Sequence, residues 1–210
     1  MGVYPELDNL NLEALINCWY QPPLDGEEYA VSYYDELAAL IREKGEAGIT
    51  FLFGEISKAN TERLGAILFF LPPQDHPLLQ DTLRSYLHDE RPHVVARAID
   101  GLRRQGEKDS INEVLSLRAH PSPYVRGSVL RFISELYPES APSLLLEALQ
   151  DPHYIVRENA IDELDRLGVV EAISSIRPLL ADPHPDTRQA AETAIQNLEE
   201  RVSDEAEDNG

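Results

Sequence analysis

The sequence is poor in cysteine and in basic residues. One cysteine among 210 residues, Cys18, permits no internal disulfide, and this is typical of reducing compartments, so we expect a cytoplasmic location. Lysine and arginine number 18 against 38 aspartate and glutamate residues, which gives a formal net charge of −20. This charge disfavours binding to nucleic acid backbones and to anionic membranes. It leaves open a basic protein partner, or a surface whose acids serve solubility.

Long apolar runs and catalytic motifs are also missing. The longest apolar run, at residues 66–71, is far shorter than the roughly 20 residues that a membrane-spanning helix needs. No phosphate-binding loop, Gly-x-Gly-x-x-Gly or Gly-x-Ser-x-Gly motif occurs, and no His-Glu dipeptide is present. We therefore expect a protein that is not an enzyme.

The chain does contain an internal repeat. Two series advance by 31 residues per copy: Arg126, Arg157 and Arg188, and Pro121, Pro152 and Pro183. Two weaker copies precede them, one with Val95 at the arginine position and one containing Arg63, which is offset by one residue that we place within residues 72–77. Self-similarity at a fixed period of this length is typical of repeat architectures.

Each copy predicts two helices. An Asp-Pro step ends one helix and starts the next, because aspartate can accept hydrogen bonds from the first turn and proline is tolerated there. Apolar residues at helical spacing then follow, as in Val156, Ala160, Ile161 and Leu164. Gly168 is the expected C-cap of this helix. One helix pair cannot bury its apolar stripe alone, whereas stacked pairs can, so the repeat predicts an α-solenoid.

The pattern Asp-Pro-x-x-x-Val-Arg followed by Ala-Ile resembles the short bacterial HEAT repeat, of the type called phycobilisome-lyase HEAT-like. The resemblance is strongest over residues 110–201, weaker over 57–109 and absent from 1–45. It implies an all-α fold, a right-handed α-solenoid of four or five HEAT-like helix pairs with an N-terminal helical cap. We expect the cap at residues 1–45, the repeat array at 46–201 and a disordered acidic tail at 202–210, where few apolar side chains offset the entropy of ordering.

The resemblance also implies structural roles for the repeated charged residues. Aspartate would cap the second helix of a pair, and arginine would pair with carboxylates or carbonyls along the stack. These roles fall on Asp151, Asp182, Arg63, Arg126, Arg157 and Arg188. The sequence departs from the pattern at His120, which replaces the aspartate, and at Val95, which replaces the arginine.

Five of the six histidines fall at predicted turns: His88, His93, His120, His153 and His184. Neighbouring repeats are spaced by about 10 Å, so no three of these side chains would reach one metal ion. We interpret them as turn and capping residues, and we expect no metal site and no cofactor.

Aromatic residues are concentrated before the repeats. Trp19 and five of the nine tyrosines lie there. One interpretation is that they cover the apolar end of the stack. The other is that they form an anchor for a partner, because tryptophan and tyrosine favour interface cores. On the second interpretation the candidate partner-binding residues are Trp19, Tyr33 and Tyr34.

The second helices predict an acidic surface. In the copy at residues 151–168 the apolar positions must face the core. The acids on the opposite side of this helix therefore face outward, toward the concave side of the solenoid. The preceding copy contributes a cation and an aromatic residue at the same register. The candidate site is therefore Glu158, Asp162, Glu163, Asp165, Arg131 and Phe132. The concave groove that carries these residues could hold a helix or a basic loop of a partner protein.

Three functions fit these observations. The first is a non-catalytic interaction module that binds a basic protein on its acidic concave face, for example an inhibitor or immunity protein against a basic toxin or nuclease. The second, which the resemblance implies, is a bilin lyase or chromophore-handling subunit. The third is a scaffold subunit of a larger complex.

Overall fold

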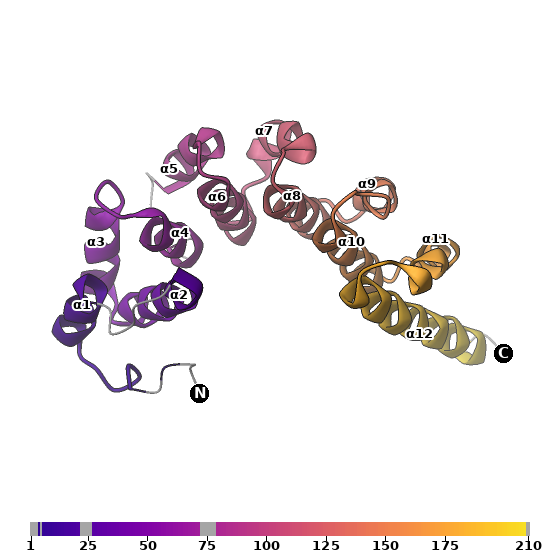
Figure 1. Ribbon diagram of the computed structural model, residues 1–210, viewed down its shortest axis with the longest axis horizontal. Coiled ribbons are helices and arrows are strands. Elements are labelled where there is room, and N and C mark those ends of the chain that lie inside the picture. Colours follow the sequence, from indigo (N-terminus) through magenta and orange to yellow (C-terminus); the bar gives the residue numbers. More distant parts are fainter. Residues whose placement is uncertain (1–3, 5, 22–26, 72–78, 209–210) are drawn as a thin grey trace. The chain divides into compact units, whose positions relative to one another are not determined.

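The computed structural model describes residues 4, 6–21, 27–71 and 79–208. Within these ranges the chain forms twelve α-helices and five short 3-10 helices, with no strand (Figure 1). It divides into two compact units, Met1–Glu107 and Lys108–Gly210. Over the described ranges, no helix combines the length and apolarity that a membrane span requires.

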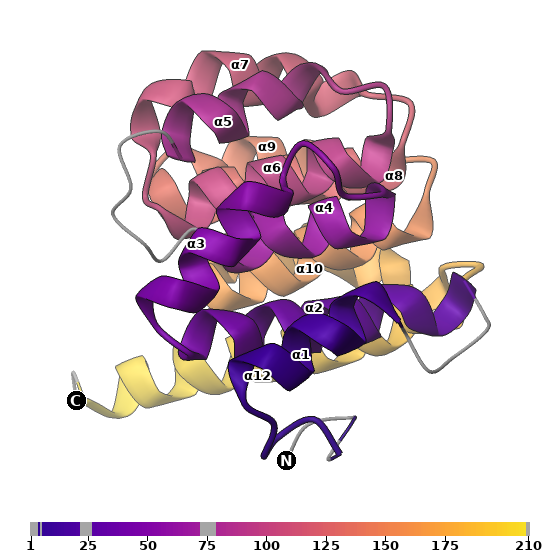
Figure 2. The same ribbon diagram turned by 90° about the vertical axis from the view of Figure 1, so that its left-hand side faces the viewer.

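The first unit consists of three helix pairs. Its helices are α1 (Leu12–Tyr20), α2 (Glu27–Glu43), α3 (Glu46–Glu55), α4 (Thr61–Phe70), α5 (Leu79–Ser85) with η1 (Tyr86–His88), and α6 (Pro92–Arg104). Helices α2, α4 and α6 lie side by side in one layer, with α3 packed on α2 and α4, and α5 on α6 (Figure 2). Asn11 and Asn60 begin α1 and α4 as N-caps, since their side chains accept from backbone N–H groups of the first turn.

The second unit repeats the same arrangement. Its helices are η2 (Lys108–Ser110), α7 (Ile111–Ser116), η3 (Leu117–Ala119), α8 (Pro123–Leu136), α9 (Ala141–Ala148), α10 (Tyr154–Leu167), η4 (Val170–Ala172), α11 (Ile173–Ile176), η5 (Arg177–Ala181) and α12 (Pro185–Asp208). Helices α8, α10 and α12 form one layer, against which the shorter helices pack (Figure 1). Gly168 ends α10 with a φ of 70°, so the predicted left-handed C-cap is confirmed.

The predicted all-α solenoid of stacked helix pairs is confirmed. After the pair α1–α2, five further pairs follow along the described chain. The structure differs at the end, where α12 continues through Asp208 although we expected disorder over residues 202–210. Extending an existing helix fixes one residue per hydrogen bond gained, which costs much less than starting a new helix. Residues 209–210 lie outside the described residues.

Repeated arginine–aspartate pairs connect successive helix pairs of the second unit. Arg126 on α8 donates through Nε and Nη2 to the two carboxylate oxygens of Asp151, at 2.8 and 2.7 Å. Arg157 on α10 contacts Asp182 in the same way, at 2.8 and 2.7 Å. Two parallel charge-assisted bonds fix orientation as well as distance. Each pair therefore fastens one long helix to the turn that precedes the next.

The aspartates hold turns and do not cap the helices directly, which corrects the role that the resemblance implied. Asp151 accepts from the backbone N–H of His153, and Asp182 from that of His184, each at 2.8 Å. Helix α10 begins later, and its N-cap is His153, whose Nδ1 accepts from the backbone N–H of Ile155. The hydrogen bond from Arg157 lowers the pKa of Asp182. Burial alone would raise the pKa of Asp151, but the hydrogen bonds from Arg126 and the His153 backbone lower it.

The other positions of the pattern behave differently. Arg188 donates to two backbone carbonyls, as the resemblance implied. Arg63 does not follow the pattern, because its guanidinium lies over the Tyr34 ring at 5.4 Å and its Nε has no hydrogen-bond partner among the described residues. His120 keeps the turn, since its Nδ1 accepts from the backbone N–H of Ser122 at 3.0 Å.

A glycine makes room for an ion pair that crosses a helix of the first unit. Arg97 on α6 donates to Asp35 on α2 at 2.6 Å, although α4 packs against both helices. A Cβ on Gly65 of α4 would lie 2.7 Å from Nε2 of His93 and 3.4 Å from Cγ of Arg97. Burial raises the pKa of Asp35 despite Arg97, and burial lowers the pKa of His93. The missing side chain therefore allows the polar cluster to pack on α4.

We expect Arg157→Ala to destabilise the protein by about 3 kcal/mol, because it leaves the carboxylate of Asp182 buried and unpaired. Arg188→Ala is the matched control, since Arg188 is exposed and its hydrogen bonds to described residues all go to carbonyls; its loss should stay near 1 kcal/mol, or about one hydrogen bond. Urea unfolding of the full chain measures both. Equal losses of unfolding free energy in the two variants would show that the buried ion pair stabilises the protein no more than the exposed hydrogen bonds do.

Gly65→Ala should destabilise the protein by about 1–3 kcal/mol, because the added methyl group overpacks the Asp35–His93–Arg97 cluster. Gly54→Ala on α3 should instead stabilise it by up to about 1 kcal/mol, since its Cβ meets nothing within 4 Å and alanine favours helix. Thermal unfolding of the two variants tests the opposite signs. A shift of the same sign in both would contradict the close approach at Gly65.

Candidate functional site

The predicted acidic residues lie on the layer of α8, α10 and α12. We call this surface the α10 face, defined by Arg131, Glu158, Asp162, Glu163 and Asp165. Asp162 is exposed and the other four are half-buried. The structure thus brings the five polar residues of the predicted site together on one side of the second unit.

Three of the five residues are engaged in contacts between helices. Arg131 of α8 donates to Asn159 of α10 at 2.6 Å. Glu163 of α10 accepts from Ser134 of α8 at 2.6 Å. Arg131 and Glu163 thus have hydrogen-bond partners within the protein, and these two bonds attach α10 to α8.

Asp165 makes the corresponding contact on the other side of α10. Its Oδ2 accepts from Asn197 of α12 at 2.7 Å, and Arg201 lies 3.9 Å from its Oδ1. Glu163 is further neutralised by Arg166, which donates to it at 2.7 Å. Much of the predicted acidity of the α10 face is therefore used within the protein.

Glu158 and Asp162 remain available. They are four residues apart on α10, one helical turn, and neither forms a hydrogen bond or ion pair with a described residue. Partial desolvation by surrounding atoms raises the pKa of Asp162 to about 6, and the charges of Glu158, Glu163 and Asp165 add to the shift. Arg131 of α8 and Arg201 of α12 contact other residues of the layer.

The aromatic members of the predicted site are corrected. Phe132 is 0% exposed and belongs to the core of α8. Trp19, Tyr33 and Tyr34 are 0%, 2% and 4% exposed. Their rings contact one another and neighbouring aromatics edge to face inside the first unit. None of the four offers surface to a partner, because burial within the helix pairs already uses their apolar area.

Sequence reasoning missed the residues that form hydrogen bonds with the charged side chains of the α10 face. Ser134, Asn159 and Asn197 are uncharged, and each reaches its partner on a neighbouring helix 28 to 32 residues away in the sequence. A search for polar residues about one repeat from each charged residue of the face would have found them. Phe132 could also have been placed in the core, since it follows Val125 and Val129 at helical spacing.

The turn histidines differ from one another. His120, His153 and His184 each accept a backbone N–H through Nδ1. The His184 ring also stacks on Tyr154 at 3.4 Å. His93 instead packs beside α4, close to Gly65. Among the described residues no three histidine, cysteine or acidic side chains are grouped so that they could hold a metal ion.

A family comparison accounts for most of the second unit. Residues 111–196 match the family model described as HEAT repeats. No curated protein matches the chain significantly.

Two solved structures resemble the whole fold. One is the crystal structure of an engineered protein, with a TM-score of 0.56 and 14% identity over 91% of this chain and 98% of that one. The other is a designed armadillo repeat protein, with a TM-score of 0.51 and 17% identity over 90% of this chain and 100% of that one. At such low identity the likeness concerns the fold alone.

Asp162→Asn should raise the melting temperature at pH 8. A pKa of about 6 in the folded state, against 3.8 for the ordinary group, means that ionisation costs stability as the pH rises from about 4 to 6. Because Asp162 is exposed, water screens the cost, and we expect a gain of about 1–3 °C. The gain should disappear near pH 4.

Glu192→Gln, at an exposed position on α12, is the control and should shift the melting temperature by the same small amount at every pH. Calorimetry between pH 4 and pH 8 measures both variants. A pH-independent effect of Asp162→Asn would exclude the raised pKa.

Proposed function

The chain is a HEAT-repeat protein, and from this premise we propose that it is a non-catalytic scaffold that binds a basic protein segment on its α10 face. Stacked helix pairs present long rows of side chains on one side, which suits the binding of extended or helical segments. The proposal rests on one observation: Glu158 and Asp162 are left unpaired on a layer where the neighbouring acids have partners.

The electrostatics of Asp162 favour a cationic partner. Its carboxylate is partly desolvated and surrounded by like charges, so an arginine or lysine placed between Asp162 and Glu158 would relieve repulsion and form charge-assisted bonds. Binding of a cation would lower the pKa of Asp162 toward its ordinary value and release a proton. Affinity should therefore rise between about pH 5 and pH 7.

The partner can take several forms. An inhibitor or immunity protein would hold a basic toxin or nuclease on this face. A scaffold subunit would hold a basic segment of its own complex. Both need the same pair of acids, and the identity of the captured protein distinguishes them.

The immobilised full chain should capture basic proteins from an extract of its source organism, identified by mass spectrometry. Glu158→Gln combined with Asp162→Asn should weaken the binding of the captured partner at least about tenfold, or 1.4 kcal/mol, because two ion pairs are lost while the side-chain shapes stay the same. The binding constant of the purified partner is then measured at pH 5.5 and pH 7.5, and it should be weaker at pH 5.5.

The matched control is Glu139→Gln combined with Glu171→Gln, which makes the same change in net charge at two exposed positions outside the α10 face. This control should bind like the unmodified chain. Equal weakening by both double variants would attribute the binding to net charge. Unchanged binding by the Glu158/Asp162 variant would remove the α10 face as the site.

A further inference from the structure

A groove lies on the other layer of the second unit, between α7–η3 and α9. Both walls pack on α8, which forms the floor. The groove consists of two pockets of about 480 and 390 Å³ that share Arg118 of η3 and Leu144 of α9 in their linings. Pockets that hold ligands have volumes of roughly 300–1,000 Å³, so each pocket is large enough to hold a bound group.

Apolar side chains line both pockets, together with several polar side chains in the larger one. The larger pocket has Val129, Leu130 and Ala148 along its floor and wall. The smaller pocket adds Leu115 and Ile133. Val129 and Leu130 are nearly fully buried, at 0% and 4% exposure, so the apolar surface that an occupant would contact comes from the half-buried Leu115, Leu144 and Ala148.

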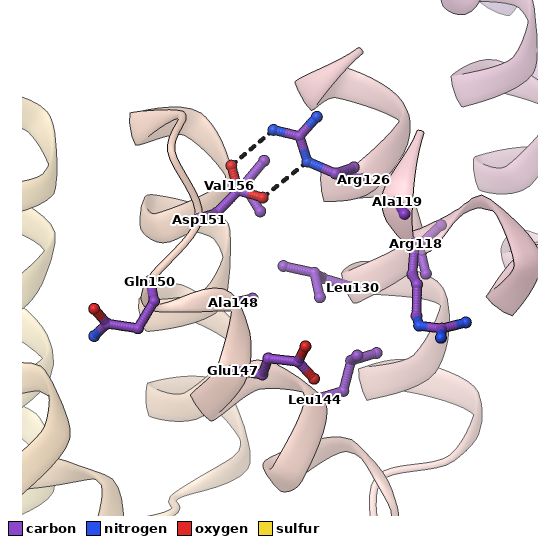
Figure 3. Close-up of a pocket in the computed structure, with 11 residues that line it drawn as sticks. Arg118, Ala119, Arg126, Leu130, Leu144, Glu147, Ala148, Gln150, Asp151 and Val156 are labelled. Atoms are coloured by element: carbon purple, nitrogen blue, oxygen red, sulfur yellow. Dashed lines mark hydrogen bonds and ion pairs between the residues drawn. The ribbon is translucent and has the colours of Figure 1, made fainter. Parts of the chain in front are cut away.

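Charged side chains of opposite sign face each other across the groove. Figure 3 shows Arg118 on one side of the larger pocket and Glu147 on the other, with Leu144 between them. Arg126 also lines this pocket, but its guanidinium is held by both carboxylate oxygens of Asp151 (Figure 3). Arg118 is exposed, and its only hydrogen bond to a described residue is a 3.4 Å contact with the carbonyl of Leu115.

We propose that this groove is a second binding site, for a segment of a partner protein that carries two apolar side chains flanking an acidic residue. One apolar side chain enters each pocket, and the carboxylate pairs with Arg118, which lies where the pockets meet. Apolar contacts supply the affinity and the charge pair fixes register and orientation. Glu147, which also lines the larger pocket, favours a peptide over a free carboxylate amphiphile. A peptide offers N–H donors and cations that can pair with Glu147, and a carboxylate amphiphile offers neither.

The test uses fluorescein-labelled peptides with two leucines and a glutamate between them, in versions with different leucine spacings. The full chain should bind at least one of them, measured by fluorescence polarisation at about 0.15 M salt, where distant charges are screened. Arg118→Glu should weaken this binding at least about tenfold. The same variant should bind the matched peptide with lysine in place of glutamate more tightly than the unmodified chain does.

Two controls separate this site from other surfaces. Arg177→Glu makes the same charge change at an exposed arginine that does not line the groove, and it should bind the peptides normally. Glu158→Gln with Asp162→Asn should also leave the peptides bound, so failure of the α10 face and failure of the groove are distinguishable. Arg118 is exposed, so its replacement should leave folding intact, and circular dichroism checks this.

Three results would overturn the proposal. No peptide of the set binds the full chain below about 1 mM. The Arg118→Glu variant binds the glutamate peptide as the unmodified chain does. Decanoate binds in the groove while the peptides do not, which would assign the site to a carboxylate amphiphile.

Discussion

The guanidinium of Arg157, which pairs with both carboxylate oxygens of Asp182, joins three parts of the second unit. The guanidinium extends from α10 and also donates to the carbonyl of Asp151. The carboxylate accepts this cation and the N–H of His184 at the turn before α12. Packing between repeats and the start of the next helix therefore depend on the same atoms. A buried ion pair stabilises only while both partners are present, so this contact constrains both positions together.

The departures from the pattern follow the same constraint. His120 stands where the aspartate is expected, and Val95, which lies 25 residues earlier, stands where its arginine is expected. Arg126 and Asp151 have that same separation, as do Arg157 and Asp182. Replacing both members together leaves no unpaired buried charge. The imidazole of His120 still accepts the turn N–H of Ser122. The boundary between the two units falls within the interval from Val95 to His120.

The net charge of −20 overstates the acidity that is available to a partner. Asp35, Glu107, Asp151 and Asp182 each form an ion pair that positions a helix or a turn. The two proposed surfaces of the second unit differ in chemistry and lie on different layers. The α10 face offers unpaired acids, whereas the groove beside α9 offers apolar pockets and one available guanidinium. A scaffold with two such surfaces can hold two segments at once, because their residues do not overlap.

The sequence alone determined the repeat period, the helix pairs, the C-cap at Gly168 and the outward direction of Glu158 and Asp162, since these depend on residues within one helix or its turns. Only the tertiary structure decided which acids stay unpaired, because Asp165 and Glu163 are satisfied by uncharged residues about one repeat away. It also buried Phe132 and the aromatic residues that one of the two interpretations assigned to a partner-binding surface. Helical periodicity shows which side of a helix faces inward. The distance to the neighbouring helix, and the side chain that it presents there, depend on how the stacked pairs pack.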